Sequence, residues 1–72
     1  MHLNPTILNN LKHNFSEGTR VELVLMDDFQ APPVGTKGTV KCVDDLGTVH
    51  ILWDTGSSLG AVFGEDIIRK LI

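Results

Sequence analysis

The sequence is poor in cysteine, in aromatic residues and in basic charge. Its 72 residues include one cysteine and no tyrosine, and Asp and Glu outnumber Lys and Arg by nine to six. A single cysteine forms no disulfide within the chain. The net charge of −3 removes the basic footprint expected of a general nucleic-acid-binding domain, so we expect nucleic acid to be an unfavoured partner.

Long apolar runs are also missing. No segment approaches the roughly 20 apolar residues that cross a bilayer. The N-terminal stretch MHLNPTILNNLK lacks the charged start and continuous apolar run of a secretory signal. We therefore expect a cytoplasmic protein with no membrane partner and a reduced thiol. With 42% apolar and 21% charged residues, the composition is that of an ordinary globular domain.

The N-terminal segment has helical features. Asn4 followed by Pro5 is typical of an N-cap and a first helical position, and Ile7, Leu8 and Leu11 recur at helical spacing. This pattern predicts a short helix over residues 5–13. We interpret residues 1–15 as a helical extension of a domain that occupies residues 16–72.

The remainder of the chain has the pattern of short strands separated by turn residues. The predicted strands cover residues 19–25, 37–43, 48–53, 58–63 and 67–71. Five short strands in so few residues favour a small closed barrel, because closure removes exposed sheet edges. The predicted fold class is therefore all-β, a small five-stranded barrel with a short N-terminal helix.

Alternation along the strands predicts which side chains are buried. Val49, Ile51 and Trp53 share one face of their strand, which favours Trp53 as a core anchor over a platform for ligand stacking. Cys42 shares a face with Val40, so we expect a buried, inert thiol. Val24 and Leu52 are apolar but are predicted to face outward. Cover by the N-terminal helix and a weak homodimer explain them equally well.

An apparent catalytic motif follows the third predicted strand. Asp54-Thr55-Gly56 matches the catalytic strand of aspartic proteases, which need two carboxylates sharing a proton and so, in a chain this short, a dimer. The segment VFGEDIIRKL resembles the part of those enzymes that braces the strand. Only seven residues separate Gly56 from Gly64, too few for the flap hairpin that lies between these motifs there. We interpret the motif as a turn and keep a dimeric aspartic hydrolase as a distant alternative.

Four collinear stretches resemble a known family. GTRVELVLMDD, APPVGTKGTV, VDDLGTVHILWDTGSSLG and GED are similar to members of the bacterial and phage domain-of-unknown-function family 4314. In that family Asp-Thr-Gly often reads Asp-Asn-Gly, a hairpin turn, and Pro often stands where this chain has Phe63. The segment GTV…VHILWDTGSS…G is more loosely similar to the SH3-like barrel repeats of the Mind bomb/HERC2 ubiquitin ligases. These resemblances imply an SH3-like barrel and a phage or mobile-element setting. The ubiquitin-ligase repeats bind protein segments, but a shared fold does not transfer a ligand.

No combination of side chains indicates an enzyme or a metal site. His2, His13, His50 and Cys42 lack the spacing of known zinc sites. We therefore expect no catalytic residue, no cofactor and no metal.

Acidic pairs in three predicted turns suggest a binding surface. In an SH3-like barrel these turns frame a groove, and here they carry Asp27-Asp28, Asp44-Asp45 and Glu65-Asp66, with Phe29, Pro32 and Pro33 as an apolar floor and Trp53 at the rim. Such a groove favours a basic, extended protein or peptide. The simpler reading is that aspartates suit turns.

The function predicted from the sequence is a non-enzymatic protein- or peptide-binding accessory module. A nucleic-acid-binding barrel is the alternative, with Lys37, Lys41, Arg69 and Lys70 gathered on one face.

Overall fold

The N-terminal helix is capped as the sequence predicts. The computed structural model describes residues 3–72, and helix α1 spans Pro5–Asn14, one residue beyond the predicted end. Asn4 Oδ1 accepts a hydrogen bond of 2.8 Å from the backbone N–H of Thr6, and Pro5 stands where a helix needs no N–H donor. Leu11 is buried, and Leu3 and Phe15 pack against the same core. These contacts attach α1 to the sheet.

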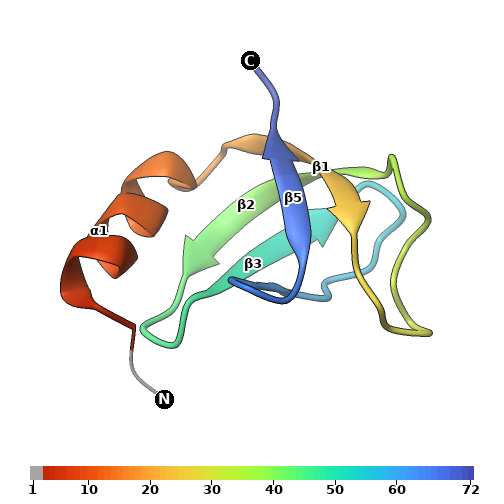
Figure 1. The fold of residues 1–72 in the computed structure, drawn as a ribbon. Coiled ribbons are helices and arrows are strands. Elements are labelled where there is room, and N and C mark those ends of the chain that lie inside the picture. Colours follow the sequence, from red (N-terminus) through yellow and green to blue (C-terminus); the bar gives the residue numbers. More distant parts are fainter. Residues whose placement is uncertain (1–2) are drawn as a thin grey trace.

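Five antiparallel strands form one sheet in the order β4-β3-β2-β1-β5 (Figure 1). Their bounds are Arg20–Leu25 for β1, Lys37–Val43 for β2, Thr48–Trp53 for β3, Ala61–Val62 for β4 and Ile67–Lys70 for β5. The sequence predicted β2 and β3 at these bounds and β1 and β5 to within one residue. No helix in the described residues is long and apolar enough to span a membrane.

Strand β4 is much shorter than the predicted strand of residues 58–63. The backbone N–H of Trp53 donates to Ser57 O at 2.8 Å, and the indole Nε1–H donates to Leu59 O, also at 2.8 Å. The segment before β4 is therefore bound to Trp53 and forms no regular ladder with β3.

The predicted fold class is confirmed as far as a mostly β fold, with one short N-terminal helix and five strands, but not as a closed barrel. The sheet bends, so that β5 passes in front of β2 and β3 in Figure 1. Within residues 3–72, however, β5 pairs only with β1 and β4 only with β3. The two end strands are not joined by a ladder of hydrogen bonds.

The core lies on the predicted face of β3. Val49, Ile51 and Trp53 are all buried, together with residues from α1, β1, β2 and β4. Trp53 is 1% exposed, so it is a core anchor, as the alternation favoured. Trp53 was also among the predicted ligand-binding residues, which remains a prediction; in this structure its indole N–H is bonded to Leu59 O and almost none of the side chain is exposed.

The prediction of a buried Cys42 is also wrong. Val40 pairs with Ile51, but Cys42 pairs with His50, so the register shifts by one residue between them. This bulge breaks the alternation of side chains, and Cys42 is exposed while Val40 remains buried. A second register shift in β1, between Leu23 and Leu25, leaves Leu25 half-exposed.

Candidate functional site

An apolar depression lies between α1, β4 and β5. Its volume is about 430 Å³, and we call it the α1–β5 groove. Leu11 and Phe15 line it from the helix side, and Val49 and Ala61 line it from the sheet. In Figure 1 the helix stands to one side of β5, and β1 lies on the other. The groove therefore opens along the side of β5 that β1 does not cover.

The rim of the groove exposes large apolar side chains. Phe63 is 48% exposed and Ile67 is 50% exposed, and both line the groove together with Ile68. Concave sites lined mainly by apolar groups, with a few polar ones, are typical places for ligands to bind. Exposed apolar surface of this kind commonly marks a contact with another protein.

A tight corner between β4 and β5 positions these rim residues. The backbone N–H groups of Glu65 and Asp66 both donate to Val62 O, at 3.1 and 2.9 Å, and Asp66 Oδ2 accepts from the N–H of Val62 at 2.8 Å. Gly64 has φ +91°, which a glycine adopts without strain. The carboxylate of Asp66 is thus used to hold the corner on which Phe63 stands.

Phe63 also links this corner to the turn after β2. Its backbone N–H donates to Gly47 O at 3.1 Å. A proline at this position, which the resemblance to family 4314 often implies, would have no N–H to donate. The contact therefore requires a residue other than proline at position 63.

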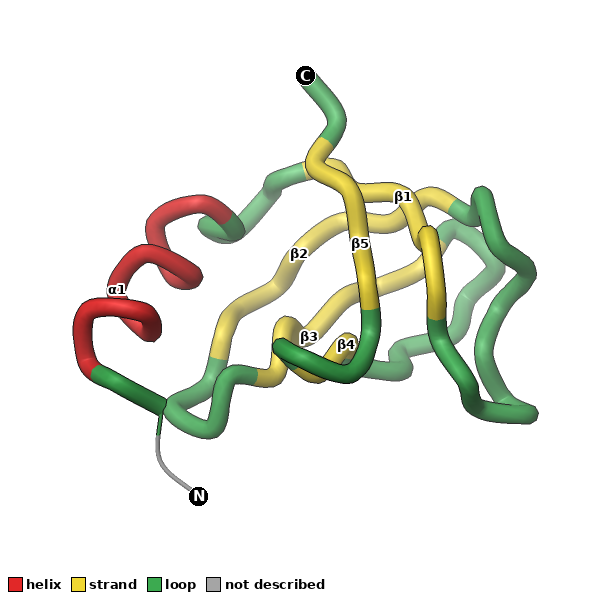
Figure 2. Tube along the Cα trace, viewed as in Figure 1, coloured by secondary structure: helices red, strands yellow, loops and turns green. Residues whose placement is uncertain are grey.

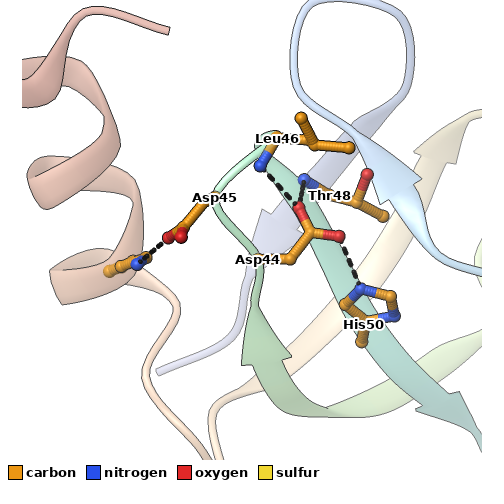
Figure 3. Close-up of polar contacts among 6 residues, drawn as sticks. Asp44, Asp45, Leu46, Thr48 and His50 are labelled. Carbon is orange, nitrogen blue, oxygen red and sulfur yellow. Dashed lines mark hydrogen bonds and ion pairs between the residues drawn. The ribbon is translucent and has the colours of Figure 1, made fainter. Parts of the chain in front are cut away.

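The turn after β2 is held by Asp44 (Figure 3). Asp44 Oδ1 accepts hydrogen bonds of 3.0 Å from the N–H groups of Leu46 and Thr48, and Oδ2 lies 2.9 Å from His50 Nε2. The bond from Thr48 and then that from His50 hold the pKa of the Asp44 carboxyl below its ordinary range. Both carboxylate oxygens of Asp44 therefore form hydrogen bonds within this turn and the start of β3.

The neighbouring Asp45 connects the same turn to the helix. Its Oδ1 lies 2.7 Å from Lys12 Nζ of α1. Figure 3 shows the Asp45 side chain directed toward the helix. Both groups are solvent-exposed, so the pair adds little stability. Together with the bond from Phe63, it connects this turn both to α1 and to the corner between β4 and β5.

Asp54, the aspartate of the apparent catalytic motif, forms a bidentate ion pair. Arg20 Nη1 and Nη2 lie 2.8 and 2.7 Å from its two carboxylate oxygens, and Nη1 also donates to Thr39 Oγ1 at 2.9 Å. These hydrogen bonds from Arg20 hold the pKa of Asp54 below its ordinary range. The predicted turn is present, since the N–H of Gly56 donates to Trp53 O at 2.8 Å.

The predicted acidic pairs are not equally close to the groove. Asp66 lines it, and Glu65 is exposed beside it on the corner. The corner lies between the other two pairs, because Phe63 bonds to Gly47 on one side and Ile67 pairs with Leu25, just before the long loop, on the other.

The long loop itself extends beyond the end of the sheet that lies away from α1 (Figure 2). This loop of residues 26–36 carries Asp27, Asp28, Phe29, Pro32 and Pro33. Phe29 is 96% exposed, Asp28 Oδ1 accepts a 2.8 Å bond from the N–H of Gln30, and Pro32 is buried. The predicted apolar floor is therefore not the apolar surface of the groove.

Sequence reasoning missed the apolar residues that line the groove. Phe63, Ile67 and Ile68 were interpreted as strand residues, and Leu11 and Phe15 as part of an extension. A signal was present in the adjacent apolar residues Ile67 and Ile68, since in a strand with one solvated face only one of them is buried. Of the soft metal ligands considered, His2 lies outside the described residues. No group of three His, Cys, Asp or Glu side chains in residues 3–72 is arranged to hold a metal ion.

Comparison with known proteins gives a family for this chain. No curated protein and no solved structure matches it significantly. The family model described as "Domain of unknown function (DUF4314)" matches residues 4–71, so the match includes α1 as well as the sheet. The chain therefore belongs to the DUF4314 family.

Proposed function

We propose that this protein is a non-enzymatic SH3-like barrel that binds a segment of another protein in the α1–β5 groove. The strand pairing supports the barrel: β1 pairs with both β2 and β5, and the bent sheet brings β4 and β5 near each other. The engagement of Asp54 by Arg20 argues against the aspartic-hydrolase alternative, because a carboxylate dyad must share a proton and not face a guanidinium.

The single observation that carries the proposal is the half-exposed apolar rim above a buried apolar floor. Phe63 and Ile67 are exposed at a concave surface whose floor includes Leu11, Val49 and Ala61. Covering these side chains with a partner removes apolar area from water, which is the main favourable contribution to association. Aromatic residues in such positions commonly dominate the binding energy.

The charge beside the groove favours a basic partner. Glu65 and Asp66 lie at its corner end. A partner with Lys or Arg at that end is steered by the local negative field, and its binding weakens as salt rises. The proposed ligand is therefore an extended segment with apolar side chains and a basic end.

Selection from a displayed library of random peptides that carry Lys or Arg, at low salt, tests this function. Selected peptides are titrated against the protein and two variants, Phe63→Ser and Phe29→Ser. The same substitution thus removes an aromatic ring from the groove in one variant and from the long loop in the other. We expect Phe63→Ser to weaken binding by about tenfold or more, as for an aromatic anchor, and Phe29→Ser to bind as wild type.

Two results contradict the proposal. Loss of binding in Phe29→Ser with normal binding in Phe63→Ser places the site on the long loop. Failure of the library to yield any peptide, with affinity for random-sequence DNA that falls steeply with salt, identifies a nucleic-acid-binding barrel instead.

A further inference from the structure

Strand β5 has one edge that no other strand covers. It is the last strand in the order β4-β3-β2-β1-β5, and in the described residues its only partner is β1. Such an edge presents unpaired N–H and C=O groups, which form a template for another extended chain. The residues that carry these groups follow from the register with β1.

The backbone groups of Ile68 and Lys70 point away from β1. The N–H of Leu71 donates to Arg20 O at 2.8 Å, so Leu71 faces β1. Backbone groups of successive residues point to opposite edges of an antiparallel strand. Arg69, opposite Glu22, then also faces β1, whereas Ile68 and Lys70 face the free edge.

The hydrogen bonds of β1 lead to the same assignment independently. Leu23 is the register partner of Ile68. Its N–H donates to Thr36 O at 2.8 Å and its C=O accepts from the N–H of Gly35 at 2.8 Å, so both groups are used on the β2 side. Leu23 therefore has no backbone donor or acceptor left to pair with Ile68, so the N–H and C=O of Ile68 are directed to the free edge.

This edge borders the α1–β5 groove. Ile67 and Ile68 line the groove from β5, and Leu11 and Phe15 line it from the opposite, helical side. Figure 1 shows the same arrangement, with α1 and β1 on opposite sides of β5. An extended chain lying in the groove is thus alongside the N–H and C=O of Ile68, and a chain that continues along β5 beyond the groove reaches those of Lys70.

We infer that the partner binds as an additional β-strand on β5, paired with Ile68 and Lys70 and lying between β5 and α1. This inference rests on the proposed function, because it specifies how the segment in the groove is held. Backbone pairing supplies the contacts common to every partner, and side chains at alternate positions supply the selectivity.

The shape and charge of the groove also determine which types of side chain the added strand carries. Ile68 packs against the core, so partner side chains on the same face as Ile68 lie over the apolar floor near Leu11 and Phe15. Every second residue of the partner is therefore apolar. The end that meets Glu65 and Asp66 is basic, by complementarity with these two carboxylates.

Two variants at one position separate backbone pairing from side-chain contacts. Lys70→Pro removes the outward N–H and leaves β1 pairing intact, since proline is tolerated on an edge strand where the N–H faces solvent. Lys70→Ala removes the same side chain and keeps the N–H. With a library-selected peptide, we expect Lys70→Pro to weaken binding by about tenfold, and Lys70→Ala to bind within about twofold of wild type.

Amide hydrogen exchange of the wild-type protein gives a second measurement that needs no variant. We expect peptide binding to slow exchange at the N–H of Ile68, which faces the free edge, and to leave that of Arg69, already paired with β1, unchanged. Slowing at both amides alike, or at neither, contradicts strand addition.

The remaining outcomes separate this inference from the function on which it rests. Equal binding by Lys70→Pro and Lys70→Ala, with binding still lost in Phe63→Ser, shows a peptide in the groove that does not extend the sheet. Absence of peptide binding by the wild-type protein overturns the function itself. A dimer in sedimentation that Lys70→Pro abolishes makes the occupant of the edge a second copy of this chain, which also overturns the inference.

Discussion

The turns at the two ends of β3 have similar backbones but use their aspartates differently. Both close with a glycine at positive φ, Gly47 at 87° and Gly56 at 95°, and in both the glycine N–H donates back across the turn. Gly47 donates to Asp44 O, so Asp44 is the first residue of its turn. Gly56 donates to Trp53 O, so Asp54 is the second.

This difference of one position determines what each carboxylate reaches. From the first position, the Asp44 side chain lies over the following N–H groups and bonds to Leu46 and Thr48. From the second position, Asp54 points away from its own turn and meets Arg20 of β1. One aspartate stabilises local structure, and the other joins strands that are distant in the sequence.

The largest expected effect is a loss of stability at the Trp53 end of β3, which is packed in the core, compared with the His50 end. Trp53→Ala should destabilise the protein by about 3–5 kcal/mol, because it removes a buried ring and leaves a cavity. His50→Ala, next to the first turn and partly exposed, should cost less than about 1 kcal/mol. Urea unfolding measures both. Equal losses would mean that the β3 register is displaced by one residue.

The next largest difference in stability should be between alanine substitutions at the two turn glycines. A Cβ at Gly47 would approach Leu3 Cδ1 to 2.5 Å, whereas a Cβ at Gly56 meets nothing within 4 Å. Both alanine variants suffer the strain of positive φ, but Gly47→Ala must also displace Leu3. We expect losses of about 2 kcal/mol for Gly47→Ala and about 1 kcal/mol for Gly56→Ala. Thermal unfolding of the pair checks this order, and the reverse order would contradict the contact with Leu3.

Removing either carboxylate should lower the free energy of unfolding by a smaller amount, and the loss should be greater for Asp44 than for Asp54. Asp44→Ala should cost about 1 kcal/mol, as for loss of a side chain that caps backbone N–H groups. Asp54→Ala should cost less, because it removes only a solvent-exposed ion pair. Urea unfolding in 1 M NaCl provides the control: salt should shrink the effect of Asp54→Ala more than that of Asp44→Ala. A salt effect of the opposite order would show that Asp44 acts mainly through its charge.

The smallest expected effect is the pH dependence that both aspartates share. The pKa of each carboxyl is lowered in the folded protein, by hydrogen bonds from Thr48 and His50 to Asp44 and by those from Arg20 to Asp54. The stability they contribute is therefore complete above the unfolded pKa, near pH 4, and is lost as the pH falls through the lower folded pKa. Carboxyl ¹³C titration by NMR should find both pKa values below that of an ordinary aspartate. A value at or above it for either residue would contradict the corresponding contacts.

The comparison of the two turns also shows what a sequence predicts. The turn residues, the cap at Asn4 and the alternation in β3 act between neighbours in the chain, so the positions of α1, β2 and β3 followed from the sequence. The candidate site did not. Asp66 was identified, but Phe63, Ile67 and Leu11 meet in the groove only because the sheet bends and brings its end strands close to each other beside the helix.

The sequence alone determined where the chain turns and which face of β3 is buried. The tertiary structure alone decided that Cys42 is exposed, that Asp54 binds Arg20 and that β5 keeps a free edge beside an apolar groove. The physical reason is the range of the interactions. Capping, turn formation and side-chain alternation depend on residues a few positions apart, whereas bulges, ion pairs between strands and grooves depend on register between segments that are distant in the chain.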